Sequence, residues 1–204
     1  MAASISTPAD ICNLALVRIG HTLRIGSLYD GSLAAKRCLD IYAQTRDEML
    51  RDEAPDFARR EISLTLLKSA PAGGYIPPTV WTTAYPQLPF TYQYGYPADC
   101  IKFGSIRNPI LFVPNFDPQP LTFSVANDNS YTPAQRVILC YTPNAIGTYV
   151  GQVTDPATMD VGFIESLAAS LARRLAVALA DPKLLEFEAK DEGAEAMAAE
   201  TVQG

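Results

Sequence analysis

The stretch DVGFIESLAASLARRLAVALA, residues 160–180, has the clearest hydrophobic periodicity in the sequence. Its apolar residues recur every three or four positions, as they do on the buried face of a helix. These residues are Phe163, Ile164, Leu167, Leu171, Leu175, Ala178 and Leu179. Asp160 can cap the start of this helix. Pro182 ends it because proline lacks an N–H donor, and Pro182 also suits the first turn of another helix. We therefore expect two consecutive helices, near residues 160–180 and 182–200.

The beginning of the chain predicts two more helices. Thr7 and Pro8 form a typical helix start, with threonine as the cap and proline at the first helical position. Ser32 can cap the second of these helices, and Pro55 ends it. We expect them near residues 8–19 and 33–53, packed against the C-terminal pair. The expected core includes Leu14, Leu39, Tyr42, Leu167, Leu171 and Leu175.

The region from Pro71 to Pro156 holds most of the 16 prolines, which indicates strands and turns instead of helices. Residues 88–96 alternate apolar or aromatic side chains with polar or small ones, the period of two that a strand requires. Further strands are expected at 101–106, 110–113, 121–125 and 137–141. They should pair antiparallel, because no helical pattern between them could supply the crossover that parallel strands need.

These elements predict an α+β fold class: a helical bundle built from both chain ends, with a Pro-rich antiparallel β insertion. The predicted parts are residues 1–70, the N-terminal part of the bundle; residues 71–154, the β-rich insertion; and residues 155–204, the C-terminal helices and tail. A chain of 204 residues is long enough to bury a core of its own.

The net charge of −6 is concentrated at the C-terminal end. From residue 181 onward, seven acidic residues face two lysines, which gives −5 for this segment alone. The acidic residues are Asp181, Glu186, Glu188, Asp191, Glu192, Glu195 and Glu200, and the lysines are Lys183 and Lys190. Such a pattern is typical of a solvated helical face. A docking role for the segment is the alternative.

The four cysteines are far apart and form no C-x-x-C motif, so we expect small buried side chains and a reducing compartment. They are Cys12, Cys38, Cys100 and Cys140. The first residues show no basic region followed by an apolar one, and no apolar run is long enough to cross a bilayer. The sequence therefore predicts synthesis in a cytoplasm.

No catalytic pattern stands out in the sequence. His21 is the only histidine, which excludes a two-histidine metal motif, and phosphate-binding loops, nucleophile elbows and EF-hand loops are missing. Tyr92, Tyr94 and Tyr96 could stack on bases, but such platforms normally lie in a basic groove, so a half-buried strand face is the preferred interpretation. We expect no enzyme activity, no catalytic residue, no metal and no cofactor.

Several short segments, taken in order, resemble the podovirus head-to-tail adaptors, the family that includes tail tubular protein A. The N-terminal ones are Ala9–Gly20, Ser27–Asp30 and the pattern Ala35-x-x-Cys-Leu39 with Tyr42, Arg46-Asp47 and Leu50. The later ones are Tyr94–Ile101, Thr154–Pro156 and the apolar pairs within 163–172. One position departs from the family, which tends to place a tryptophan after Pro55, where this chain has Asp56-Phe57.

The resemblance implies a structural virion protein without catalysis, located at the neck of the tail and assembled in the host cytoplasm. It implies a ring of twelve identical subunits that joins the portal protein to a tail nozzle protein of the tail tubular protein B type, with contacts to tail fibre proteins. DNA would pass through the lumen without specific binding, in keeping with a chain that has few basic residues.

The segment after residue 181 is the expected portal-docking site, because it offers apolar anchors among acidic residues. The candidate docking residues are Leu184, Leu185, Glu186, Phe187, Glu188, Asp191, Glu192, Glu195 and Met197. Other functions stay open at this point: a neck or head-completion protein of another phage lineage, a cytoplasmic enzyme with the β region as a lid, or a non-viral β-rich ligand-binding module.

Overall fold

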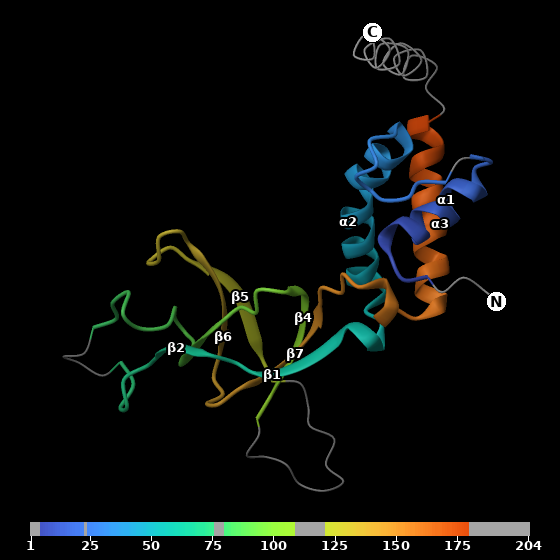
Figure 1. Cartoon of the computed structure of the whole chain (residues 1–204). Coiled ribbons are helices and arrows are strands. Elements are labelled where there is room, and N and C mark those ends of the chain that lie inside the picture. The colour runs from blue at the N-terminus through green and yellow to red at the C-terminus, as the bar shows by residue number, and fades with distance from the viewer. Residues whose placement is uncertain (1–4, 23, 76–79, 109–120, 180–204) are drawn as a thin grey trace, which may run out of the picture. The chain divides into compact units, whose positions relative to one another are not determined.

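The computed structural model describes residues 5–22, 24–75, 80–108 and 121–179. In these residues the chain is α+β, with three α-helices and seven strands in two antiparallel sheets (Figure 1). The chain divides into two compact units. A helical unit comprises residues 1–53 and 153–204, and a sheet unit comprises residues 54–152.

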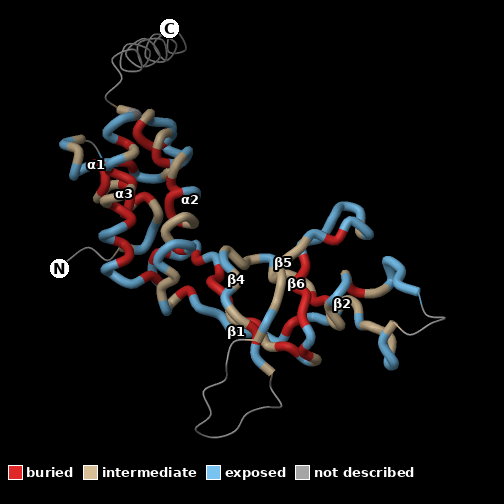
Figure 2. The backbone as a smooth tube through the Cα atoms, turned by 180° about the vertical axis from the view of Figure 1, so that it is seen from behind, coloured by how far each residue is buried: buried red, intermediate tan, exposed pale blue. Residues whose placement is uncertain are grey.

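The described part of the helical unit contains α1 (Pro8–Arg18), α2 (Leu33–Glu53) and α3 (Val161–Leu179). Helix α3 contacts both α1 and α2, and buried residues line the sides on which these helices meet (Figure 2). These bounds confirm the three helices expected near 8–19, 33–53 and 160–180 to within a residue at each end. The helix expected at 182–200 lies outside the described residues.

Local hydrogen bonds explain where α1 and α2 begin. The Asp10 N–H donates to Thr7 Oγ1 at 3.3 Å, and the Thr7 N–H donates back to Asp10 Oδ2 at 2.9 Å, which is a capping box. The Ala35 N–H donates to Ser32 Oγ at 3.2 Å. Both caps therefore satisfy N–H groups that a helix start leaves without an intrahelical partner.

The predicted helical core is confirmed for Leu167, Leu171 and Leu175, which are fully buried, and for Tyr42. Leu14 is half-buried. The prediction for Leu39 is wrong, since 38% of this residue is exposed. The buried side of α2 runs through Ala34, Ala35, Cys38, Tyr42, Thr45, Arg46 and Leu50. Leu39 lies one position beyond Cys38, which turns its side chain by about 100° from that line.

The first sheet has the strand order β1-β7-β4, and its strands are β1 (Arg59–Ser63), β7 (Ile146–Gly151) and β4 (Cys100–Arg107). The second sheet has the order β2-β3-β6-β5. Its strands are β2 (Leu66–Ser69), β3 (Tyr92–Gly95), β6 (Gln135–Cys140) and β5 (Phe123–Asp128). All pairings between the described strands are antiparallel, which confirms the predicted pairing for them. The strand expected at 110–113 lies outside the described residues. Short 3₁₀ turns, η1 (Asp56–Ala58) and η3 (Pro156–Thr158), lie near the two connections between the units.

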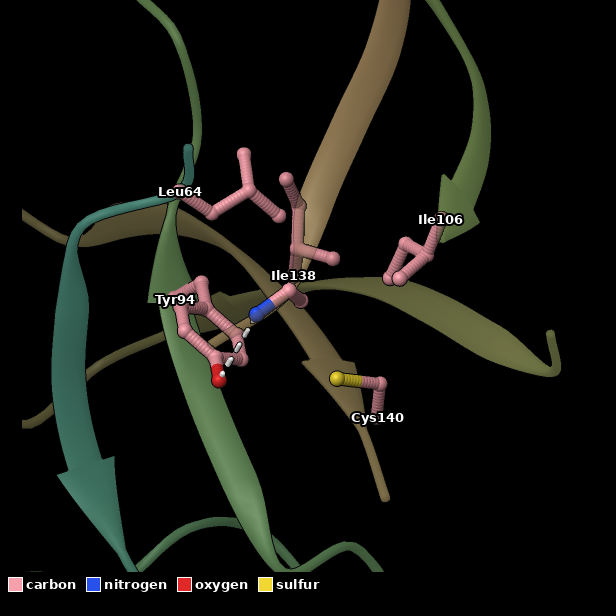
Figure 3. Close-up of a cluster of buried hydrophobic side chains, with 6 residues drawn as sticks. Leu64, Tyr94, Ile106, Ile138 and Cys140 are labelled. Carbon is pink, nitrogen blue, oxygen red and sulfur yellow. Dashed lines mark hydrogen bonds between the residues drawn. The ribbon is translucent and has the colours of Figure 1, made fainter. Parts of the chain in front are cut away.

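One apolar cluster holds the two sheets together. It combines Ile106 of β4 with Tyr94 of β3 and Ile138 of β6, and Leu64 covers one side (Figure 3). The Tyr94 hydroxyl donates to the Thr142 carbonyl at 2.9 Å. The cluster lies wholly within the sheet unit, which therefore has a core of its own.

The predicted fold class, a helical bundle with a Pro-rich β insertion, is wrong. The described chain has three helices against seven strands in two sheets, and the four-helix bundle from both chain ends is not shown. The β region is a separate unit that begins at Ala54 and buries its own cluster. β1 and β2 belong to it, although they precede the predicted boundary at residue 70.

Candidate functional site

The predicted portal-docking residues, from Leu184 to Met197, all lie outside the described residues. Their role stays a prediction from the sequence. Among the described residues, functional groups also gather in a groove between α2 and α3 and in a pocket at one end of the second sheet.

His21 lies where α1 ends, and its backbone N–H donates to the Leu16 carbonyl at 3.0 Å. In the described ranges, no three His, Cys, Asp or Glu side chains come close enough together to hold a metal ion. None of the described helices is both long and apolar enough to cross a membrane.

The cysteines have structural positions. Cys12, Cys38 and Cys140 are fully buried, Cys100 is half-buried, and all four are free thiols. A hydrogen bond to Cys38, together with burial, raises the pKa of the Cys12 thiol. Burial also raises the pKa of Cys140. The interpretation of these cysteines as small buried side chains is therefore confirmed for three of the four.

The tyrosine run proves to be a strand face. Tyr94 is buried in the sheet core, whereas Tyr92 and Tyr96 are half-buried at its margin. The rings of Tyr92 and Tyr94 stack with centroids 6.4 Å apart. Their faces are used in packing within the protein, as the preferred interpretation expected.

The groove between α2 and α3 has a volume of about 450 Å³. Its lining residues are Glu48, Met49, Asp52 and Glu53 from α2 with Ser166, Ala169, Ser170, Arg173 and Arg174 from α3. Arg174 forms an ion pair with Glu48, and this contact lowers the pKa of the glutamate. The other charged residues are exposed or half-exposed, so the described lining of the groove holds no buried charge for a ligand to meet.

A buried polar cluster of the sheet unit is centred on Lys68 of β2 and Asp128 of β5. Lys68 Nζ lies 2.5 Å from Asp128 Oδ2, and only 10% and 7% of these side chains are exposed. Lys68 also donates to the Thr83 carbonyl and to Ser130 Oγ, both at 2.8 Å. Gln93 Nε2 donates to Asp128 Oδ2 at 2.6 Å. This cluster connects three strands, β2, β3 and β5, to the loop that contains Thr83.

Burial by itself would raise the pKa of Asp128. The hydrogen bonds that its carboxylate accepts from Lys68, Gln93 and Ser130 outweigh this effect and hold the pKa well below its usual range. Asp128 is therefore ionised at neutral pH and compensates the Lys68 ammonium.

A pocket of about 300 Å³ opens beside this ion pair. Its lining residues are Lys68, Trp81, Thr83, Tyr85, Gln87, Asn127, Asp128, Asn129 and Ser130. None of these residues was predicted to be functional from the sequence. Two features of the sequence mark the place: Trp81 is the only tryptophan, and Asn127-Asp128-Asn129 has the polar composition that is typical of a turn. Neither feature shows that Lys68, which precedes Asp128 by 60 residues in the sequence, completes the cluster.

Comparison with models of known protein families gives no match for this sequence. A search of curated proteins likewise finds none that is similar.

Proposed function

We propose that this chain is a structural virion protein, a head-to-tail adaptor that forms a ring between the portal protein and the tail nozzle. The observation that carries this proposal is the order of short sequence segments, from Ala9 to Ala172, that resemble those of the podovirus adaptors. The function is one of binding and assembly. In it, twelve subunits surround the DNA, which moves through the lumen without specific contacts.

The positions of the resembling residues support this proposal. In α1, Ile11, Cys12 and Ala15 are fully buried, and in α2 the same holds for Ala35, Cys38 and Leu50. In α3, Leu167 and Leu171 are fully buried. These side chains determine how the three helices pack, so a chain with the same residues in the same order is expected to build a similar helical unit.

The loop that joins α1 to α2 also supports the adaptor proposal, because a residue of a resembling segment fixes its conformation. Asp30, the last residue of the second resembling segment, accepts hydrogen bonds from the Gly26 and Ser32 N–H groups, each at 3.0 Å. These bonds fix the turn that leads into the Ser32 cap. The resemblance therefore includes a residue with a defined local role as well as core positions.

Electron microscopy of the purified chain, alone and with purified portal protein, tests the proposal. Rings that attach to the portal are the expected result. A chain that stays monomeric and leaves the portal free, while its circular dichroism shows a folded protein, would contradict the adaptor function.

A chain that ends at Asp181 tests the docking segment separately. We expect it to fold and to lose attachment to portal-bearing particles. If the acidic residues face a basic portal surface, attachment of the full chain should also weaken as salt is raised. Normal attachment of the truncated chain would show that the segment from Leu184 to Met197 is only a solvated face.

A further inference from the structure

The pocket beside Lys68 and Asp128 has walls that are fixed before any ligand binds. Trp81 Nε1 donates to the Pro86 carbonyl at 2.7 Å, which holds the indole against its own loop. Lys68 binds the Thr83 carbonyl of the same loop at 2.8 Å, and Gln87 Nε2 donates to the Asn127 carbonyl at 3.1 Å. Three hydrogen bonds therefore order the wall that residues 81–87 contribute, and an ordered wall lowers the entropy cost of binding.

The two charged groups at this pocket, the Lys68 ammonium and the Asp128 carboxylate, are paired with groups of the protein itself. The Lys68 ammonium has three acceptors, the Thr83 carbonyl, Asp128 Oδ2 and Ser130 Oγ. The Asp128 carboxylate accepts from Lys68, from Gln93 and from the Ser130 N–H. Among the described residues, no other charged side chain lines the pocket. Its electrostatics therefore favour a neutral ligand over an anion or a cation.

The groups that remain available are polar but uncharged. In the described part of the chain, the Asn129 side chain and Gln87 Oε1 have no hydrogen-bond partner, and both residues line the pocket. An amide group can donate and accept at once, which suits a hydroxyl group, because a hydroxyl also does both. A ligand with several hydroxyls close together would satisfy these groups.

Trp81 adds an apolar surface to these polar groups. It is the only tryptophan of the chain, 38% of it is exposed, and it lines the pocket. A flat aromatic face binds a ligand that presents C–H groups on one side, while the polar edge of the ligand meets the amides. A pyranose ring has this character. A nucleotide would also stack, but its phosphate would meet no free cation in the part of the pocket that the described residues form.

We propose that the pocket formed by Trp81, Gln87, Asn129 and the Lys68–Asp128 pair binds a neutral saccharide. Trp81 stacks on the sugar ring, and the Gln87 and Asn129 amides bind its hydroxyls. The ion pair holds the loop and the strand ends in place. This inference does not depend on the adaptor function, since it rests on the sheet unit alone.

The single tryptophan makes the site directly observable, because its emission reports on the pocket. We would titrate the full chain with glucose, galactose and N-acetylglucosamine, and with glucuronate and adenosine monophosphate as charged probes. The expected result is a saturable change in emission with at least one of the three neutral sugars. No such change with any of them, or saturation by the charged probes only, would overturn the proposal.

Variants then assign the binding to this pocket. Asn129 is exposed, so Asn129→Ala should fold normally, and we expect it to bind the sugar about tenfold more weakly, since it loses hydrogen bonds to the hydroxyls. Gln44→Ala, which removes an exposed amide from the helical unit, serves as the matched control and should bind unchanged. Trp81→Ala, followed by calorimetry, should bind no sugar. Equal affinity in Asn129→Ala and the control would refute the site.

Discussion

Replacing Asp128 with asparagine should destabilise the sheet unit far more than replacing an exposed acid. The side chain keeps its size, but Lys68 loses its counter-charge in a site where only 10% of the lysine side chain is exposed. Leaving one buried charge without its partner costs about 3–5 kcal/mol. We expect about 3 kcal/mol, the lower end of that range, because Lys68 keeps the Thr83 carbonyl and Ser130 Oγ as acceptors.

Urea unfolding, monitored by the emission of Trp81, measures the loss of unfolding free energy in the sheet unit, which contains Trp81. With a slope of about 2 kcal/mol per M, a loss of about 3 kcal/mol lowers the midpoint by about 1.5 M. Glu61→Gln is the matched control, since Glu61 pairs with Arg107 at 3.0 Å while 47% of each side chain is exposed. An exposed pair is worth about 1 kcal/mol at most. Equal midpoint shifts in the two variants would show that the Lys68–Asp128 pair is not a buried interaction.

Three further outcomes follow from the same structure. The pKa of Asp128 is lower in the folded state than in the unfolded state, so the stabilisation it provides is present above about pH 4 and is lost as the pH falls through the folded pKa. In the same urea assay, the unfolding free energy of the Asp128→Asn variant should therefore fall less steeply between neutral and acidic pH than that of the original chain. Parallel falls in the two proteins would contradict the pKa shift. Leu171→Ala removes a fully buried side chain from α3 and should cost about 2–5 kcal/mol, visible as a lower thermal midpoint in circular dichroism; an unchanged midpoint would exclude Leu171 from the core. Tyr94→Phe leaves the Thr142 carbonyl without the donor that lies 2.9 Å away and should lower the unfolding free energy by about 1–3 kcal/mol. A decrease within the error of the urea assay would show that another donor replaces the tyrosine hydroxyl.

The helices could be predicted from the sequence because their determinants are local. The capping box at Thr7 and Asp10 lies within four residues, and the stripe through Leu167, Leu171 and Leu175 follows the helical period. Leu39 was misplaced because an apolar residue at the edge of a stripe fits either side of it. Only packing against α3 decides which side of α2 is buried.

Strands β1, β2 and β7 were not predicted, because the contacts that determine them are not local in the sequence. Every residue of β1 is exposed, so no alternation marks it, and its state depends on pairing with β7, more than 80 residues away. β7 contains Gly147 and Gly151, which suggest a loop in the sequence. In the structure a Cβ at Gly147 would lie 2.8 Å from the Leu64 side chain, and one at Gly151 would overlap Arg60. These glycines allow close packing across the sheet.

The strand predicted at 88–96 is shorter than its pattern suggested, because β3 covers only Tyr92–Gly95. Pro89 has no N–H for a ladder, and the Phe90 N–H donates to the Gln87 carbonyl at 3.1 Å in a turn. The turn brings Gln87 to the pocket wall. The departure from the predicted strand therefore contributes one of the proposed sugar-binding groups.

The division of the chain separates the tests of its two proposed functions. The segments that resemble the adaptors lie mainly in the helical unit, whereas the whole Trp81 pocket lies in the sheet unit, which has its own apolar cluster. Removal of the residues after Asp181 should therefore abolish portal attachment and leave the Trp81 sugar titration unchanged. Asn129→Ala should weaken the sugar titration about tenfold and leave portal attachment unchanged. If the truncated chain also lost sugar binding, the two units would have to be energetically coupled, and the pocket could no longer be explained by the contacts of the sheet unit alone.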